Sequence, residues 1–233
     1  MSLRALRTLL WLAVGLAAVA LVGIAWNLPS GRLEAEGQGA TATIGGDFSL
    51  VDQDGRSRTW ADFRGKPVAV FFGFTNCPDI CPTTLGELSV TLADLDKAGG
   101  RGDDLQVMLV TGDPERDTPA VLDTYLQSFD PRIVGLTGAE AEVDRAFSVF
   151  KAYRRKVPLE NGGYTMDHSA GIYLYDASGK FTGTLDLHED ADTRRRKVER
   201  LLDSSEGRAS AEDPRSMAST SRATGAFDGG TNG

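Results

Sequence analysis

The only two cysteines of the chain, Cys77 and Cys81, stand four positions apart. They follow a strand-like apolar run over residues 68–74 and precede a helix-like run that Pro82 opens. A strand-to-helix turn with paired thiols suits redox and soft-metal chemistry, because the free N–H groups of the first helical turn and the helix dipole stabilise a thiolate. Since proline fits the first helical position and keeps the preceding residue out of the α region, we expect both cysteines to lie in the turn itself. A simple structural disulfide is the alternative, but closing so short a loop constrains little of the unfolded chain.

An uncharged apolar run of 18 residues, 9–26, lies near the amino terminus, with Arg4 and Arg7 before it and Arg32 after it. That length predicts a membrane-spanning helix, and a cleaved signal peptide is the alternative. The basic residues ahead of the run favour a cytoplasmic amino end and export of everything after about residue 30. Too few residues precede the run for a mitochondrial presequence. We therefore expect a single-pass protein of a bacterial inner membrane, with its soluble domain in the oxidising periplasm.

The remaining organisation follows from composition. Residues 1–30 are the predicted membrane anchor, and residues 31–41 are a tether rich in Gly, Ala, Glu and Gln. Residues 42–203 are long enough for one well-buried core. Residues 204–233 have few large apolar side chains, and we expect them to be disordered. The net charge of −8 argues against nucleic acid as a partner.

Apolar periodicity and turn residues predict an α/β fold with a central sheet and helices on both faces. This order resembles the thioredoxin fold with an amino-terminal β-hairpin extension, preceded by one transmembrane helix. The expected elements are a hairpin at 48–62, strands at 67–74, 105–111 and 133–136, helices at 83–97, 119–129 and 140–150, a second hairpin at 171–185, and a closing helix at 190–202.

His168 is the candidate third ligand beside the cysteines. It lies just before the strand that opens the last hairpin. In a thioredoxin-like fold the loop before that strand packs against the cysteine turn and usually carries a cis-proline, which is absent here. The fold therefore predicts that His168 lies close to Cys77 and Cys81, whereas an ordinary loop histidine is the alternative. The other histidine, His188, is interpreted as a surface residue at the entry to the last helix.

Two thiolates and one imidazole form a soft ligand set. A closed zinc site prefers four ligands, and an iron–sulfur cluster prefers four cysteines. Three ligands therefore favour copper, either as Cu(I) held mainly by sulfur or as Cu(II) with further oxygen or nitrogen ligands. Asp167 is the natural residue to orient the imidazole or to shape its loop.

Three segments together resemble the Sco (SenC/PrrC) family: Cys77-Pro78-Asp79-Ile80-Cys81-Pro82-Thr83, Asp113-Pro114-Glu115-Arg116-Asp117-Thr118-Pro119 and Asp167-His168-Ser169. The resemblance covers residues 45–200. It implies a thioredoxin-fold copper protein that helps to build the binuclear copper centre of cytochrome c oxidase. It also implies that Cys77, Cys81 and His168 are the copper ligands, and that the copper-receiving subunit of the oxidase is the partner. The tail beyond Ser204 is not part of the pattern.

The segment from Asp113 to Pro119 follows the end of a predicted strand, at the edge where α/β proteins place their sites. In one interpretation its acidic residues receive a basic partner or hold the neighbouring loop by hydrogen bonds. In the simpler interpretation the segment is a strand-to-helix loop in which Asp117 or Thr118 caps the following helix, and this explains most of its residues.

Two functions remain open at this point. In the first, the chain is a copper metallochaperone. In the second, it is an enzyme, a membrane-tethered thiol–disulfide reductase whose Cys77–Cys81 pair is the redox-active group that keeps the copper-ligand cysteines of a target reduced. Other copper chaperones or thiol reductants are further partners that these roles imply. A thiol peroxidase is disfavoured, because the proline of the usual Pro-x-x-x-Thr/Ser-x-x-Cys setting is missing before Cys77.

Overall fold

The computed structural model describes residues 44–160, 162–186 and 189–212, together with four separate residues near the amino terminus: Arg7, Trp11, Gly15 and Leu16. The chain divides into two units, Met1–Ala42 and Thr43–Gly233. No helix among the described residues is long and apolar enough to cross a membrane. The predicted span at 9–26 and the predicted tether at 31–41 lie almost wholly outside the described residues, as does His188.

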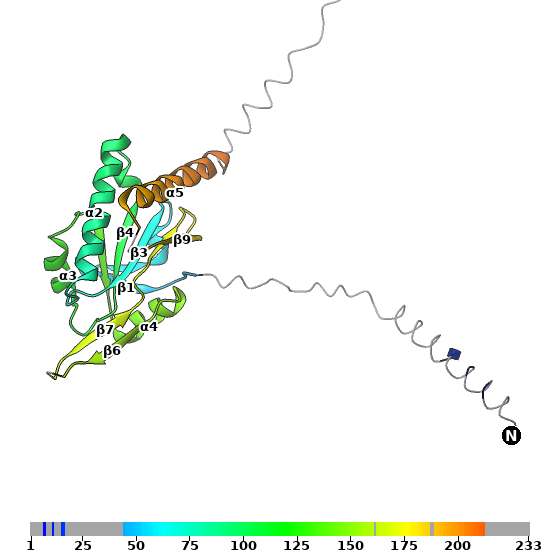
Figure 1. Cartoon of the computed structure of the whole chain (residues 1–233), viewed down its shortest axis with the longest axis horizontal. Helices are drawn as coiled ribbons and strands as arrows, with labels where there is room; N and C mark the ends of the chain where they lie inside the picture. The colour runs from blue at the N-terminus through cyan, green and yellow to red at the C-terminus, as the bar shows by residue number, and fades with distance from the viewer. Residues whose placement is uncertain are drawn as a thin grey trace, which may run out of the picture. The chain divides into compact units, whose positions relative to one another are not determined.

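The second unit contains two sheets, and its larger one has seven strands in the order β2-β1-β5-β4-β3-β8-β9 (Figure 1). Its three central strands are parallel to one another, and all other pairs are antiparallel. The strands are β1 (Ser49–Asp52), β2 (Ser57–Thr59), β3 (Val68–Gly73), β4 (Gln106–Thr111), β5 (Ile133–Thr137), β8 (Ile172–Tyr175) and β9 (Phe181–Leu185). Strands β6 (Arg154–Pro158) and β7 (Tyr164–His168) pair separately as a two-stranded antiparallel ribbon.

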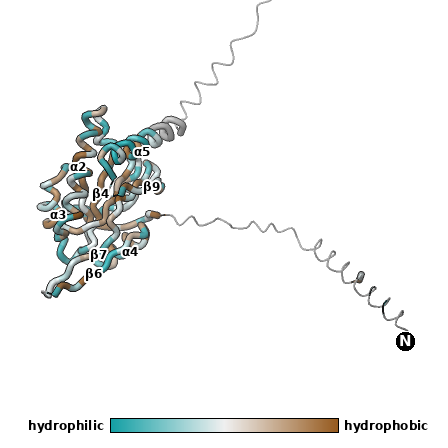
Figure 2. The backbone as a smooth tube through the Cα atoms, viewed as in Figure 1, coloured by the Kyte–Doolittle hydropathy of each residue, from teal (hydrophilic) through white to brown (hydrophobic). Residues whose placement is uncertain are grey.

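Helices cover both faces of the large sheet. The helical elements are η1 (Trp60–Phe63), α2 (Ile80–Gly99), η2 (Gly102–Asp104), α3 (Pro119–Leu126), α4 (Glu140–Val149) and α5 (Ala191–Glu212). Apolar side chains of α2, α3 and α5 form one core with Ala69 and Phe71 of β3. Those of α4 and η1 form the other core with Val70 and Phe72. Because strand side chains alternate between faces, β3 must be apolar throughout, and Figure 2 shows the central strands as hydrophobic.

The predicted elements of the large sheet are confirmed, but the start of α2 was predicted wrongly. The helix begins at Ile80 with Asp79 as its cap, so Cys81 lies in the first helical turn and not in the preceding turn. Pro82 is the third residue of that helix. Proline is accepted there because the first N–H groups of a helix have no intrahelical acceptor, so no hydrogen bond is lost.

Two further differences concern segments that lack strong apolar periodicity. The β6–β7 ribbon was not predicted, because its strands are short and β6 is rich in arginine and lysine. Helix α5 continues to Glu212, beyond the predicted end at Leu202. The helix thus enters the segment from residue 204 that was predicted to be disordered, and within it the buried Ser205 hydroxyl donates a hydrogen bond to the Leu201 carbonyl.

Candidate metal centre

Cys81 and His168, which are 87 positions apart in the sequence, are in contact. The Sγ atom of Cys81 lies 3.7 Å from Nε2 of His168. Cys81 comes from the first turn of α2, and His168 is the last residue of β7. The contact confirms the predicted proximity of these two side chains, and it depends on the ribbon lying beside the cysteine turn.

The orientation of the His168 ring leaves Nε2 available as a ligand. The other ring nitrogen, Nδ1, lies 2.8 Å from the carbonyl oxygen of Ser169. A carbonyl only accepts hydrogen bonds, so Nδ1 carries the proton and the Nε2 lone pair faces the Cys81 sulfur. Phe71 and Phe74 meet the imidazole edge to face, with ring centroids 6.3 Å and 5.6 Å away, and restrict its rotation.

Cys77 completes the group from the turn before α2. It is half-buried, and its Sγ atom accepts a hydrogen bond of 3.4 Å from the backbone N–H of Cys81. That N–H belongs to the first helical turn and has no intrahelical acceptor, so the Cys77 sulfur satisfies it. Both cysteines are free thiols in this structure.

The Cys81 sulfur packs closely against Gly73 at the end of β3. A Cβ atom added to Gly73 would lie 3.1 Å from this sulfur and 2.8 Å from the ring of Phe71, so only glycine leaves room for the thiol. Cys81 is fully buried. Burial raises the pKa of its thiol well above the usual range, and the hydrogen bond with Cys77 and the carboxylate of Asp117 act in the same direction.

Asp117 fixes the cysteine turn from the segment that follows β4. Its buried carboxylate accepts hydrogen bonds from the backbone N–H of Thr75 at 3.0 Å and from the hydroxyls of Thr75 and Thr111. Burial nevertheless raises the pKa of Asp117. The helix cap is Thr118, whose Oγ1 accepts from the N–H of Val121. Asp117 therefore holds the neighbouring loop by hydrogen bonds, which was one of the two interpretations of this segment.

The same segment fixes the ribbon that carries His168. The buried carboxylate of Asp113 accepts a hydrogen bond of 2.9 Å from the hydroxyl of Tyr164 and is paired with Arg116. Arg116 also donates to the Tyr164 carbonyl at 3.1 Å, and its guanidinium stacks 3.9 Å from the centre of the Tyr164 ring. We call Asp113, Arg116 and Tyr164 the ribbon clamp. The segment from Asp113 to Pro119 thus positions both the cysteine turn and the ribbon that carries His168. This role depends on tertiary contacts, and the sequence gave no signal of it beyond the motif itself.

Of the two predicted roles of Asp167, orienting the imidazole or shaping its loop, the contacts of its carboxylate do not support the first. Its carboxylate is exposed and pairs with Arg155 at 3.3 Å across the ribbon. The Ser169 carbonyl holds the His168 ring instead. Because successive strand residues point to opposite faces, Asp167 and His168 face opposite ways along β7.

Within the described part of the chain, no three His, Cys, Asp or Glu side chains are gathered closely enough to form a ready metal site. Two of the three predicted ligands, Cys81 and His168, are in contact, and Cys77 is linked to Cys81 through its amide. Two sulfurs and an imidazole nitrogen whose lone pair is free still form a soft donor set. These three residues therefore fit a soft metal ion by the chemistry of their donor atoms.

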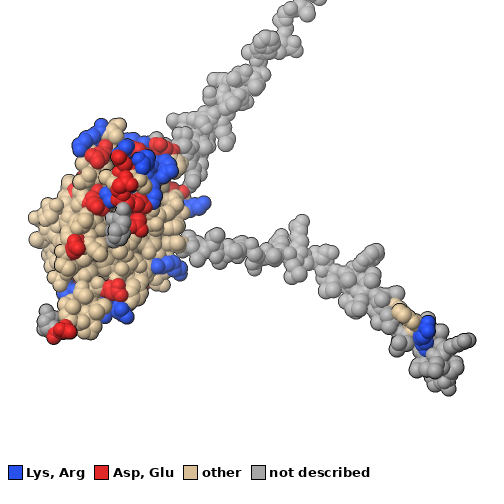
Figure 3. All heavy atoms as spheres, viewed as in Figure 1, with Lys and Arg blue, Asp and Glu red and all other residues tan. Residues whose placement is uncertain are grey.

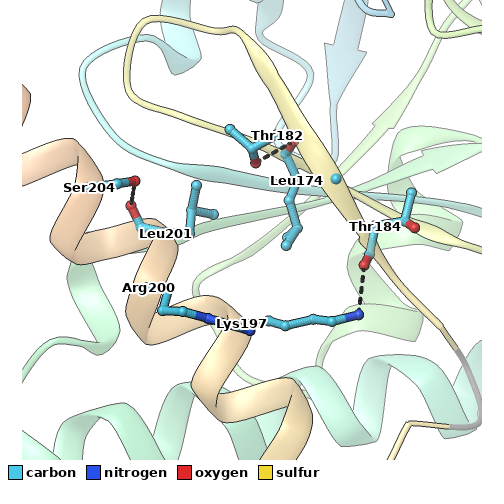
Figure 4. Close-up of a pocket in the computed structure, with 8 residues that line it drawn as sticks. Leu174, Thr182, Thr184, Lys197, Arg200, Leu201 and Ser204 are labelled. Atoms are coloured by element: carbon cyan, nitrogen blue, oxygen red, sulfur yellow. Dashed lines mark hydrogen bonds between the residues drawn. The ribbon is translucent and has the colours of Figure 1, made fainter.

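A cavity of about 410 Å³ lies elsewhere, between α5 and the β8–β9 hairpin (Figure 4). Its lining includes Leu174, Lys197 and Arg200, and Lys197 donates a hydrogen bond of 3.3 Å to the Thr184 carbonyl. Neither cysteine nor His168 lines it, so this cavity is separate from the candidate metal centre.

Comparisons with known proteins place the chain in a family. The sequence model of the SCO1/SenC family matches residues 36–203. The protein named SCO2 homolog, mitochondrial, from Bos taurus is 41% identical over 174 residues, covering 74% of this chain and 62% of that protein. The chain thus matches less than two thirds of that relative's length.

Solved structures share this fold. Bradyrhizobium japonicum ScoI with copper bound is 42% identical with a TM-score of 0.63, covering 68% of this chain and 99% of that chain. Yeast Sco1 with copper bound is 36% identical with a TM-score of 0.65, covering 76% of this chain and 98% of that chain. The likeness confirms the predicted fold of the described domain. Since the family model covers well over half of the sequence, the chain belongs to the SCO1/SenC family.

Proposed function

We propose that this chain is a copper metallochaperone, which binds copper through Cys77, Cys81 and His168 and passes it to the copper-receiving subunit of cytochrome c oxidase. The contact that carries the proposal is the 3.7 Å approach of Cys81 Sγ to His168 Nε2, with the proton of the imidazole held on Nδ1. Relatives with copper bound support copper as the cargo. Membership of the SCO1/SenC family supports the oxidase as the destination.

The soft donor set suits copper in transit. Thiolates bind Cu(I) strongly, and an imidazole adds a ligand that is lost more easily. Loading requires both thiols to lose their protons, and the amide of Cys81, which donates to the Cys77 sulfur, stabilises the thiolate that results. A partner that offers its own cysteines at the half-buried Cys77 then competes for the metal.

An anaerobic titration of the reduced, metal-free full-length chain with Cu(I) tests the proposal. The wild type binds one copper ion per chain tightly. His168→Ala weakens that binding about tenfold to a hundredfold, whereas His188→Ala, which changes the only other histidine, leaves it unchanged. Equal affinities in the wild type and His168→Ala would remove the histidine from the ligand set.

A thiol–disulfide reductase is the second candidate function, because both cysteines are free and four positions apart. In that reaction the thiol of the more accessible Cys77 attacks a target disulfide, and Cys81 then resolves the mixed disulfide. Two electrons and two protons pass to the target, which becomes a dithiol while Cys77 and Cys81 form a disulfide. An external thiol must then reduce this pair again. His168→Ala retains this reaction, so a chain that reduces a model disulfide but binds no copper would be a reductase.

The chain is held in a bacterial inner membrane by residues 9–26, with the soluble domain in the periplasm. The length of the uncharged run and the preceding Arg4 and Arg7 support this placement. After expression in a Gram-negative host, the protein should resist extraction from membranes at alkaline pH, and protease added to spheroplasts should digest the domain. Recovery in the soluble periplasmic fraction would instead show a cleaved signal.

A further inference from the structure

The side chain of Arg154, the first residue of β6, is only 7% exposed. Arginine is rarely buried to this extent unless it is paired. Its guanidinium donates a hydrogen bond of 2.8 Å to the carbonyl of Gly112 and pairs with Glu140 and Asp144 of α4 at 2.7 Å and 2.6 Å. It also lies 5.6 Å from the centre of the Phe147 ring. A planar guanidinium with partners on this many sides is fixed in one position.

Arg154 lies directly opposite His168 in the β6–β7 ribbon. Side chains of opposite residues in an antiparallel pair stand on the same face, with Cβ atoms about 4.5–5.5 Å apart. The next pair along the ribbon, Arg155 and Asp167, points to the other face, where the two side chains pair with each other. Contacts that fix Arg154 therefore also fix the backbone from which the His168 imidazole projects.

The carbonyl that Arg154 binds belongs to the cysteine side of the metal centre. Gly112 directly follows β4, and its N–H donates a hydrogen bond of 2.7 Å to the carbonyl of Gly73, the last residue of β3. The Cys81 sulfur packs against Gly73. A continuous series of contacts therefore leads from the residue opposite His168, through two backbone groups, to the residue that seats the Cys81 sulfur.

The ribbon clamp does not replace this attachment. It holds β7 at its first residue, Tyr164, whereas His168 is the last residue of the strand. These two positions are about 13 Å apart at the usual rise of a strand. A ribbon fixed only at Tyr164 leaves the His168 end free to swing, and Arg154 supplies the attachment at that end.

We propose that Arg154 is a positioning residue of the metal centre, which fixes the separation between the His168 imidazole and the cysteine sulfurs. This inference rests on the proposed function, since it concerns how the proposed histidine ligand is presented. Arg154 is not itself a ligand, because a guanidinium carries only donors. Lysine keeps the positive charge but lacks the planar fork, so it cannot reproduce the same set of hydrogen bonds.

Arg154→Lys is the decisive variant, and Arg155→Gln is its matched control. Arg155 is the next residue of the same strand, but it is exposed and faces away from the metal centre. Arg154→Lys keeps a cation beside Glu140 and Asp144 and should remain folded, as circular dichroism will show. Arg154→Gln, which also removes the charge, should lower the melting temperature further.

The first readout needs no copper. In the reduced, metal-free full-length chain, the His168 ring packs edge to face on Phe71 and Phe74, so nuclear Overhauser effects should connect these rings in the wild type. Arg154→Lys should lose these signals, and Arg155→Gln should keep them. A lower melting temperature with the ring signals unchanged would mean that Arg154 only stabilises the fold, and it would overturn the inference.

The second readout is a competition titration with a Cu(I) chelator. Affinity should fall about tenfold in Arg154→Lys and stay at the wild-type value in Arg155→Gln. Loss of the ring signals with unchanged copper affinity would also overturn the inference, because the position of His168 would then not matter to the metal. If the wild type binds no copper, the proposed function fails, and the ring signals alone decide whether Arg154 positions His168.

Discussion

The two halves of the metal centre are built in different ways. The cysteine turn lies between β3 and α2, and Cys81 is part of a core that extends through α2, α3 and α5. The β6–β7 ribbon, which carries His168, contributes only Met166 to that core and packs Tyr164 against it. Its other anchors are polar: the ribbon clamp, and Arg154, which donates to the Gly112 carbonyl and pairs with Glu140 and Asp144. The cysteine half is therefore fixed mainly by burial of apolar surface, whereas the ribbon half depends more on polar contacts, which are easier to break.

This difference suggests that the two halves have different roles in metal binding. A rigid sulfur pair keeps the metal in place, while the histidine ligand sits on an element that opens at lower free-energy cost. Surface contacts such as those of Lys156 with Glu115 and Arg155 with Asp167 add little, because exposed ion pairs are weak. The buried Asp113 carboxylate and the nearly buried Arg154 side chain are better shielded polar anchors of the ribbon.

The largest effect is expected from a change in the buried half. Cys81→Ser should abolish tight copper binding and prevent disulfide formation, because it removes a sulfur ligand that no other cysteine can replace. The variant should still unfold cooperatively, as measured by circular dichroism, since serine is close to cysteine in size. Retention of one tight copper ion per chain by Cys81→Ser would show that the sulfur pair is not the anchor.

A change in the ribbon clamp should have a smaller and more local effect. Asp113→Asn removes a charged partner of Arg116 and Tyr164, which costs about 1.5–3 kcal/mol of ribbon stability. Amide hydrogen exchange in β6 and β7 should speed up about tenfold or more, since 1.4 kcal/mol is tenfold. Exchange in β3 should change far less than in the ribbon.

Copper affinity should also fall in Asp113→Asn, because His168 is held less well, while the reduction potential of the Cys77–Cys81 pair should stay near that of the wild type. Lys97→Ala, which breaks an exposed ion pair far from the site, is the control. Equal acceleration of exchange throughout the domain would mean that the ribbon and the core unfold as one unit.

The converse change targets the cysteine half and spares the ribbon. Gly73→Ala places a methyl group against the Cys81 sulfur and the Phe71 ring, and overpacking of this kind costs about 1–3 kcal/mol. The melting temperature should fall, and copper affinity should fall with it, while the ribbon amides keep their relative protection. Gly86→Ala, where an added Cβ meets nothing within 4 Å, is the control and should not lower the melting temperature.

The smallest effect concerns a region remote from both halves. Arg132 pairs with Asp96, Asp103 and Asp130 near the carboxyl end of α2, where Figure 3 shows acidic and basic side chains gathered. The hydrogen bonds of Arg132 hold the pKa of Asp130 below its ordinary 3.8. Such a depressed pKa stabilises the fold above about pH 4, and that stability is lost as the pH falls through the folded-state value.

When the pH is lowered from 4 to 2, the melting temperature of Asp130→Asn should therefore fall by less than that of the wild type. Its copper affinity at pH 7 should equal that of the wild type. A copper affinity that changed in this variant would mean that the metal centre is coupled to the far end of α2, which would contradict the local character of both halves.

The buried half could be predicted from the sequence because its signals are local. The apolar run of β3, the leucines of α2 and the cap at Thr118 follow from periodicity and capping, and each lies close to its predicted place. The start of α2 was predicted too late, since a proline was assumed to occupy the first helical position although the third is equally free of an intrahelical bond.

The ribbon half could be predicted only in part. The proximity of His168 to the cysteines followed from the order of elements, but the strand that carries it did not, because β6 and β7 are short and β6 is rich in charge. The roles of Asp113 and Asp117 required the three-dimensional structure, since Tyr164 and Thr75, through which they hold the ribbon and the cysteine turn, lie 51 and 42 positions away in the sequence. Which atom holds the proton of His168 also depends on a contact, with the Ser169 carbonyl, that no sequence pattern shows.

X-ray absorption spectroscopy of the Cu(I)-loaded chain tests the central claim most directly. The wild type should show two sulfur ligands and one nitrogen ligand, His168→Ala should lose the nitrogen, and Asp113→Asn should show it with reduced occupancy. A site with two sulfurs and no nitrogen in all three proteins would show that the ribbon does not contribute a ligand, and it would contradict the assembly of the metal centre from two halves.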